Sequence, residues 1–302
     1  MFGVMTGVFL AVAMVTWASA LTREKCALKN LIIGIFYMKI VPINLTDVES
    51  KCAVRVFCLP YAGGSALIYR GWQQLVPDWM HVCPIELPGR GTLFAEAPAH
   101  SLAELAREVS AVLLACEGHP FALFGHSMGA LIAYEAARTL ELAGSRSLVY
   151  LFLSGARPPF LSRNHEPISH LPDSEFIEKL RKLNGTPKEV LDHGELMELL
   201  LPVIKNDFRI VERHEFEHGK LIDTPTVAFT GVEDSEVSVN DVYQWSKLIN
   251  SRLRVVELSG DHFFIKYRSK DILKEMTNCL SSPFREHSVP KACSPVSLFW
   301  SE

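Results

Sequence analysis

The sequence has little of what marks a disulfide-stapled, metal-binding or nucleic-acid-binding protein. Its 302 residues include seven cysteines, an odd number, and no two of them form a C-x-x-C pair. This usage argues against a disulfide framework and against a zinc site, and it is typical of a reducing compartment. No block of basic residues stands out, and the formal net charge is -4. We therefore predict no metal site and no nucleic-acid partner.

Charged side chains are absent from residues 1–22, which are apolar for most of their length. The segment could be a secretory signal that ends at Ala18-Ser19-Ala20, although the basic stretch expected at its start is missing. It could be a membrane anchor, because about 20 apolar residues span a bilayer. It could also be extra sequence that precedes a start at Met38. We predict a cytoplasmic protein, with export or membrane anchoring through residues 1–22 as the alternatives.

Composition predicts a globular chain with a sizeable core. Hydrophobic residues make up 48% and charged residues 21% of the sequence, as in folded proteins. The length suffices for one large or two modest domains. A regular pattern occupies residues 51–281, after an apolar extension at 1–50, and residues 282–302 are expected to form a loose tail. No internal repeat is visible, and a monomer is the default expectation.

Segments with strand character alternate with helical segments along residues 51–281. Such alternation predicts the α/β class, with a mostly parallel central sheet and helices on both faces. One helix should begin at a capping box formed by Ser101 and Glu104, and another should end at Gly144. The predicted strands are 53–60, 81–89, 121–125, 147–159, 224–231 and 252–260, and the predicted helices are 67–76, 101–117, 130–144, 237–249 and 269–280.

Residues 160–221 interrupt this alternation, because they lose the strand rhythm and have helical spacing. An insertion at this point would lie over the carboxyl ends of the strands, where ligands bind in such sheets. We therefore predict a helical lid at 160–221. Its apolar stretch at 196–204 could line a substrate pocket or form the core of the lid, and the lid core is the favoured interpretation.

A serine stands at a tight corner between a predicted strand and a predicted helix, in Gly125-His126-Ser127-Met128-Gly129. A strand, G-x-S-x-G and a helix in this order form a nucleophile elbow. Side chains two residues before and after the serine would clash with the neighbouring elements, and the glycines remove these clashes. The turn would lift the Ser127 hydroxyl above the sheet and direct the N–H of Met128 toward developing negative charge.

A serine nucleophile needs a base. In folds that contain a nucleophile elbow, an acidic residue and then a histidine follow later strands of the sheet. His262 follows the last predicted strand and is the candidate base. Asp234 is the candidate that orients its imidazole, with Glu233 beside it as the alternative. Asp261 is adjacent to His262 in the chain, which would require an awkward geometry. The alternatives are a structural histidine and a carboxylate that only caps a helix.

The loop after the first predicted strand, residues 60–65, contains two glycines. In this fold that loop supplies the second N–H that binds a developing oxyanion. We predict Ala62 as the donor and keep Gly63 as the alternative, and a simple turn is the other interpretation. The lysine of a phosphate-binding P-loop is absent, and we predict no bound cofactor.

Six stretches in a fixed order carry a family resemblance. They are FCLPYAGGSA (57–66), IELPGRG (85–91), PFALFGHSMGALIAYEAAR (120–138), LFLSGARPP (151–159), FTGVEDSEVS (229–238) and LSGDHFFI (258–265). Together with the helical lid they resemble the type II thioesterases that accompany nonribosomal peptide and polyketide synthases, over residues 52–281. The resemblance implies an α/β-hydrolase fold that hydrolyses acyl thioesters. It also implies an acyl or peptidyl carrier protein as partner, with the acyl group on its phosphopantetheine arm.

The resemblance maps the family's catalytic serine, aspartate and histidine onto Ser127, Asp234 and His262, and its oxyanion donors onto Ala62 and Met128. Such enzymes clear misprimed or stalled carriers. Two other functions remain open on the same fold. One is a carboxylesterase or lipase that acts on small esters, and the other is a non-catalytic binding module.

The sequence departs from the family pattern at a few positions. Tyr61 is only a mild departure, since the position usually has histidine or another aromatic residue, and Glu233 stands where aspartate is common. Residues 1–50 have no counterpart in the family. Arg90 matches the family's P-G-R motif, which we interpret as structural, with contact to a carrier or a phosphate as the alternative.

Overall fold

The structure is a computed structural model that describes residues 41–42, 53–162 and 166–286. The predictions for residues 1–22 and for a start at Met38 lie outside the described residues. Within the described ranges, no helix combines the length and the hydropathy that crossing a membrane requires.

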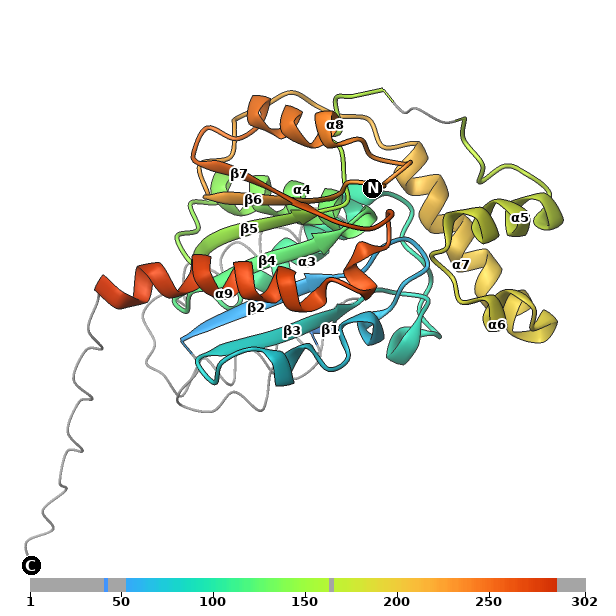
Figure 1. The fold of residues 1–302 in the computed structure, drawn as a ribbon, viewed down its shortest axis with the longest axis horizontal. Coiled ribbons are helices and arrows are strands. Elements are labelled where there is room, and N and C mark those ends of the chain that lie inside the picture. The colour runs from blue at the N-terminus through green and yellow to red at the C-terminus, as the bar shows by residue number, and fades with distance from the viewer. Residues whose placement is uncertain (1–40, 43–52, 163–165, 287–302) are drawn as a thin grey trace, which may run out of the picture. The chain divides into compact units, whose positions relative to one another are not determined.

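A seven-stranded sheet forms the centre of the fold (Figure 1), in the order β1-β3-β2-β4-β5-β6-β7. Every pair is parallel except that of β1 with β3. This arrangement confirms the predicted mostly parallel sheet. The strands are β1 Val41–Pro42, β2 Val54–Leu59, β3 Met80–Glu86, β4 Phe121–His126, β5 Leu148–Ser154, β6 Thr226–Gly231 and β7 Leu253–Leu258.

Helices cover both faces of the sheet, as predicted (Figure 1). Along β2, Val56 and Cys58 belong to one hydrophobic cluster, whereas Phe57 and Leu59 belong to another. This alternation places successive side chains on opposite faces. The cluster of Phe57 packs against α3 (Leu102–Leu114), α4 (Met128–Leu142) and α8 (Val239–Tyr243), and the other packs against α9 (Ser269–Glu286).

Local capping marks the start of α3 and the end of α4. The Ser101 hydroxyl accepts a hydrogen bond from the N–H of Glu104 at 3.1 Å. The Glu104 carboxylate accepts from the N–H of His100, the residue before Ser101. Helix α4 gives way at Gly144, whose φ of 78° is left-handed and whose N–H donates to the carbonyl of Glu141.

Residues 67–76 form two short 3-10 helices instead of the single predicted helix. These are η2 (Ala66–Tyr69) and η3 (Trp72–Leu75). They are separated because Gly71 adopts a φ of 88°, which a continuous right-handed helix does not allow. The apolar spacing that predicted a helix instead serves to bury Tyr69 and Trp72 against the sheet.

Two other elements differ in length from the prediction. The predicted helix at 237–249 is divided into α8 and the 3-10 helix η5 (Gln244–Lys247). Helix α9 continues to Glu286, so the predicted loose tail at 282–302 begins with helix. Residues 287–302 lie outside the described part of the chain.

Three helices, which we call the insertion, lie between β5 and β6. They are α5 (Asp173–Leu183), α6 (Lys188–Leu191) and α7 (Gly194–Glu212). Buried side chains of the insertion form a separate hydrophobic cluster, composed of Phe176, Leu180, Leu191, Met197, Leu201 and Ile204. Three of these lie in the apolar stretch at 196–204, which supports the lid-core interpretation of that stretch.

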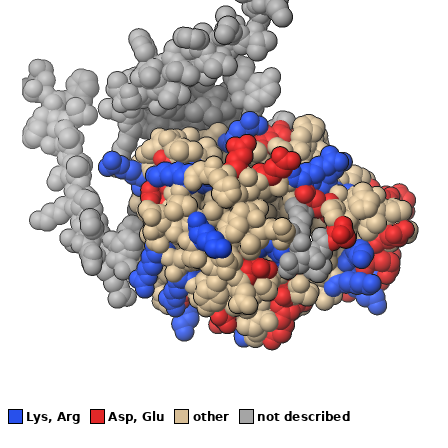
Figure 2. Space-filling view, turned by 90° about the horizontal axis from the view of Figure 1, so that it is seen from above, with Lys and Arg blue, Asp and Glu red and all other residues tan. Residues whose placement is uncertain are grey.

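The described surface carries both signs of charge. On the face seen in Figure 2, lysines and arginines stand among aspartates and glutamates and do not merge into one basic area of the described residues. Charge of mixed sign offers little electrostatic attraction to a polyanion such as a nucleic acid.

Helix α4 approaches β2 closely at the predicted elbow, because glycines leave room. A Cβ atom on Gly129 would stand 2.2 Å from the carbonyl oxygen of Leu59. A Cβ atom on Gly125 would stand 2.1 Å from the carbonyl oxygen of Gly129. Both distances are far below van der Waals contact with backbone atoms that cannot move aside. The end of β2, the end of β4 and the start of α4 are therefore held together.

We expect Gly129→Ala to destabilise the fold by about 3 kcal/mol or more, because the added methyl forces the backbone of α4 away from β2. Urea unfolding measures the effect. Gly194→Ala is the matched control, since Gly194 is also helical and a Cβ there meets nothing within 4 Å. The control should change stability by less than about 1 kcal/mol. Equal losses in both variants would contradict the steric explanation.

Candidate active site

Ser127 lies at the corner between β4 and α4 in a strained backbone conformation. Its φ of 54° and ψ of -116° fall outside the regions that a non-glycine residue favours. Hydrogen bonds hold the corner, because the Ser127 N–H donates to the carbonyl of Ser154 at 2.8 Å and the Ser127 carbonyl accepts from Ala130 at 2.9 Å. This observation matches the predicted nucleophile elbow.

Ser127, His262 and Asp234, which we call the triad, form one hydrogen-bonded chain. The distance from Ser127 Oγ to His262 Nε2 is 3.0 Å, and that from His262 Nδ1 to Asp234 Oδ2 is 2.8 Å. A carboxylate only accepts hydrogen bonds, so Nδ1 carries the ring proton and Nε2 is left to accept from the serine hydroxyl. The side chain of His262 is 11% exposed and that of Asp234 is fully buried.

The three acidic candidates have different partners. Asp234 follows β6, and its other oxygen, Oδ1, accepts from the N–H groups of Glu236 at 2.8 Å and Val237 at 3.0 Å. The Glu233 carboxylate accepts from the N–H of Gly260. Asp261 accepts from the N–H of Phe263, two residues ahead. Among these three candidates, the structure brings only Asp234 to the ring of His262.

Loop 60–65 lies beside the start of α4, as the contact of Leu59 with Gly129 requires. The N–H of Gly63, the alternative oxyanion donor, donates to Asp207 Oδ2 at 2.7 Å. No described residue accepts a hydrogen bond from the N–H of Ala62 or of Met128. These two amides are therefore available to a bound group, whereas that of Gly63 is already engaged.

His126 is a residue that the sequence analysis missed. It is fully buried, its Nε2 lies 2.9 Å from the carbonyl oxygen of His262, and its Nδ1 lies 2.9 Å from Ser154 Oγ. A carbonyl only accepts, so Nε2 carries the proton and Nδ1 accepts from the serine hydroxyl. Burial, together with the nearby His262, lowers the pKa of His126 well below its usual value. A neutral ring thus anchors the backbone of His262.

Arg90 is buried, with 6% of its surface exposed. Its guanidinium donates to both oxygens of Asp207 and to the carbonyl oxygens of Gly64 and Pro88. These contacts lie inside the protein and support the structural interpretation of the P-G-R motif. The sequence predicted neither Asp207 as a partner nor the contact with loop 60–65.

A pocket of about 570 Å³ lies between the insertion and the residues on either side of His262, and no triad residue lines it. Phe263 and Lys266 line it from the segment that follows His262. The Lys266 ammonium donates to the carbonyl oxygens of Asn184 and Gly185 in the insertion. The pocket therefore has walls from both parts of the fold.

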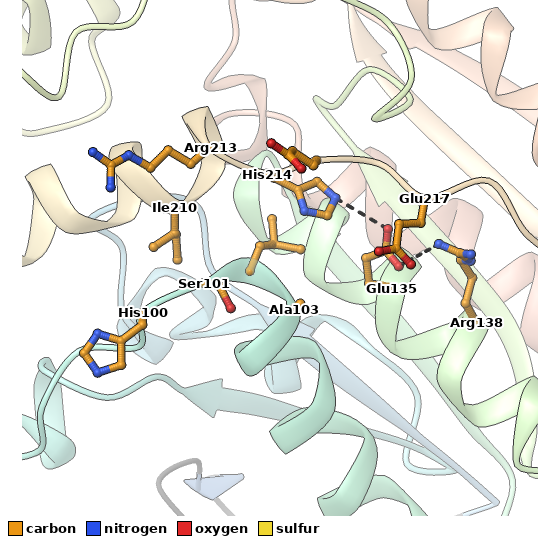
Figure 3. Close-up of a pocket in the computed structure, with 11 residues that line it drawn as sticks. His100, Ser101, Ala103, Glu135, Arg138, Ile210, Arg213, His214 and Glu217 are labelled. Carbon is orange, nitrogen blue, oxygen red and sulfur yellow. Dashed lines mark hydrogen bonds and ion pairs between the residues drawn. The ribbon is translucent and has the colours of Figure 1, made fainter.

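A second pocket, of about 280 Å³, lies among α3, α4 and the residues after α7 (Figure 3). His214 points toward Glu135 of α4, with Nε2 3.5 Å from a carboxylate oxygen, and Arg138 binds the other oxygen of that carboxylate. None of the triad residues lines this pocket. The contact of His214 with Glu135 joins the residue after the end of α7 to α4.

We expect His126→Gln to reduce the acid sensitivity of the fold. Because the folded state lowers the pKa of His126, the unfolded chain binds a proton below about pH 6.5 that the folded chain rejects. This contribution makes wild-type stability fall as pH drops below that value. Glutamine keeps an N–H donor for His262 but does not titrate.

The stability difference between wild type and His126→Gln should therefore shrink from pH 7.5 to pH 5, by up to about 1.4 kcal/mol per pH unit. Urea unfolding of both proteins across this range measures it. A difference that stays constant with pH would show that the ring titrates alike in the folded and unfolded states.

Comparison with known proteins places the chain in a family. Residues 54–279 match the family model described as thioesterase domain. Linear gramicidin dehydrogenase LgrE of Brevibacillus parabrevis is 37% identical over 77% of this chain and 90% of its own length. Gramicidin S biosynthesis protein GrsT of Aneurinibacillus migulanus is 37% identical over 74% of this chain and 87% of its own length.

A solved structure gives the same result. The type II thioesterase BorB from the borrelidin biosynthetic cluster has a TM-score of 0.71 and 33% identity, over 81% of this chain and 98% of BorB. The name of LgrE denotes an oxidoreductase, but the matched region of this chain contains the hydrogen-bonded serine, histidine and aspartate of a hydrolase. The chain therefore belongs to the thioesterase family and is a thioester-hydrolysing enzyme of the α/β-hydrolase fold.

Proposed function

We propose that the triad hydrolyses acyl thioesters carried on the phosphopantetheine arm of an acyl or peptidyl carrier protein. The observation that carries this proposal is the chain of two hydrogen bonds, 3.0 Å from Ser127 to His262 and 2.8 Å from His262 to Asp234. Relatives named for gramicidin S biosynthesis and for the borrelidin cluster support a carrier protein as the partner. A cytoplasmic location belongs to the same proposal.

The first half of the reaction forms an acyl-enzyme. The Ser127 hydroxyl gives its proton to His262 Nε2 while Oγ attacks the thioester carbonyl carbon. When the tetrahedral intermediate collapses, its C–S bond breaks and the carrier thiolate takes the proton from His262. The carrier leaves as a free thiol, and the acyl group remains on Ser127 as an ester.

The second half frees the acid. Water gives a proton to His262 Nε2 and attacks the ester carbonyl, the C–Oγ bond breaks, and Ser127 recovers its proton. In both halves the N–H groups of Ala62 and Met128 bind the oxyanion, because each points to no acceptor in the described protein and Met128 begins a helix. Asp234 stabilises the imidazolium, since its carboxylate already binds the Nδ1–H.

We expect Ser127→Ala to lower kcat at least about 10⁴-fold, because no nucleophile remains. Two assays measure this. One follows release of acetate from an acetylated, phosphopantetheinylated carrier protein, and the other follows hydrolysis of p-nitrophenyl acetate. Ser251→Ala is the control, since Ser251 is also half-buried and its hydroxyl donates a hydrogen bond to the carbonyl of Thr224. It should keep wild-type kcat.

The outcomes of this assay separate the candidate functions. Carrier turnover that survives Ser127→Ala overturns the mechanism. Turnover of the ester without turnover of the carrier substrate assigns a small-ester hydrolase. A wild-type protein inactive on both substrates assigns a non-catalytic module.

We expect Asp234→Asn to lower kcat about 10³- to 10⁴-fold, because an amide NH₂ facing Nδ1 favours the wrong ring tautomer. Glu233→Gln is the matched control, since Glu233 is the neighbouring carboxylate and binds Gly260 instead of the ring. It should stay within about threefold of wild type. A larger loss in Glu233→Gln than in Asp234→Asn would reassign the acid to Glu233.

A further inference from the structure

Asp207 is a buried carboxylate of α7 that binds loop 60–65. It is 1% exposed and lies in the insertion, 144 residues from the glycine whose N–H it accepts. That N–H, of Gly63, belongs to the peptide unit formed with the carbonyl of Ala62. Asp207 therefore fixes the peptide plane that directly follows the proposed oxyanion donor.

Arg90 holds the Asp207 carboxylate in place and binds the same loop. One guanidinium nitrogen lies 2.5 Å from Asp207 Oδ2 and another lies 2.8 Å from Oδ1, a bidentate pair. The first nitrogen also donates to the carbonyl of Gly64 at 3.2 Å. The buried ion pair thus holds an N–H and a carbonyl of loop 60–65 at once.

Helix α7 also packs directly on Gly63. The φ of Gly63 is 74°, and a Cβ atom there would stand 3.0 Å from the side chain of Ile204. A side chain at this position would be strained by the positive φ and would press against α7. Ile204, which makes this contact, and Asp207, which accepts the hydrogen bond from the Gly63 N–H, lie three residues apart on the same face of the helix.

Docking of the insertion alone does not explain these contacts. Asn206, the neighbouring buried residue, already holds α7 by donating to the carbonyl of Ala99 at 2.9 Å, away from the loop. A buried ion pair is also a weak source of stability, because the desolvation of both charges offsets their attraction. A role in positioning accounts for why the pair points at loop 60–65.

We infer that Asp207, held by Arg90, is a positioning residue that sets the Ala62 N–H in the oxyanion hole, so that the hole is complete only while α7 is docked. This inference rests on the proposed role of Ala62 in thioester hydrolysis. It makes the insertion a part of the catalytic geometry in addition to a wall of the 570 Å³ pocket.

The test compares three variants of the full chain. In Arg90→Met with Asp207→Leu, both charges are replaced by apolar side chains, so no unpaired charge is buried and the fold should be retained. Asp207→Asn keeps an oxygen that can accept from Gly63 but leaves the buried Arg90 without its counterion, so urea unfolding of this variant is measured beside its kcat. Asn206→Ala loses a buried hydrogen bond of the same helix that does not reach the loop.

We expect the double variant, Arg90→Met with Asp207→Leu, to lose about 10- to 100-fold in kcat on p-nitrophenyl acetate. Its KM should stay within about threefold of wild type, because the Ala62 N–H donor acts in the transition state. Asp207→Asn should recover part of the loss. Asn206→Ala should keep wild-type kcat. An unchanged kcat in the folded double variant, or an equal fall in Asn206→Ala, overturns the inference.

Hydrogen exchange of the peptide that spans 60–66 gives a readout that needs no activity. Its amides should exchange faster in the double variant and at the wild-type rate in Asn206→Ala. Unchanged exchange in the double variant overturns the inference. If the wild type shows no turnover that depends on Ser127, the proposed function fails, whereas the exchange experiment still decides whether Asp207 orders the loop.

Discussion

The active site depends on one steric constraint, the approach of α4 to the ends of β2 and β4 without any side chain in between. The missing Cβ atoms of Gly125 and Gly129 allow backbone to pack on backbone. This contact forces Ser127 into its strained turn and places the first N–H of α4 beside loop 60–65. Both amides proposed to bind the oxyanion come from the two segments that are pressed together, so the same contact sets the spacing between them.

Buried polar groups surround this contact, and each is held by specific partners. The neutral ring of His126 connects the loop after β7 to the end of β5, and the pair of Arg90 and Asp207 connects the insertion to the loop after β2. Such networks stabilise one arrangement when all their members are satisfied, and they destabilise the fold when a member is lost. The backbone groups of the site are therefore held in fixed positions. The residues that hold them do not contact the substrate.

The order of the triad residues could be predicted from the sequence, because each follows a strand and parallel strands bring their carboxyl ends to one edge. The choice between Ala62 and Gly63 could not, since it depends on Asp207, which lies 144 residues further along the chain. The role of His126 could not be predicted either, because the G-x-S-x-G motif accepts any residue at its position. The break at Gly71 was missed because apolar spacing reports which side chains are buried and not whether the backbone is continuous.

The parallel sheet also has a consequence for the time at which the enzyme becomes active. Ser127 and His262 are separated by 135 residues, and His262 follows β7, the last strand of the sheet in chain order. Long-range pairings of this kind form late, because the intervening chain must first be closed into a loop. While β7 is still inside the ribosome, the growing chain has an exposed Ser127 but lacks His262, the base of that serine. The triad therefore cannot form before His262 has been synthesised, and Ser127 has no base until then.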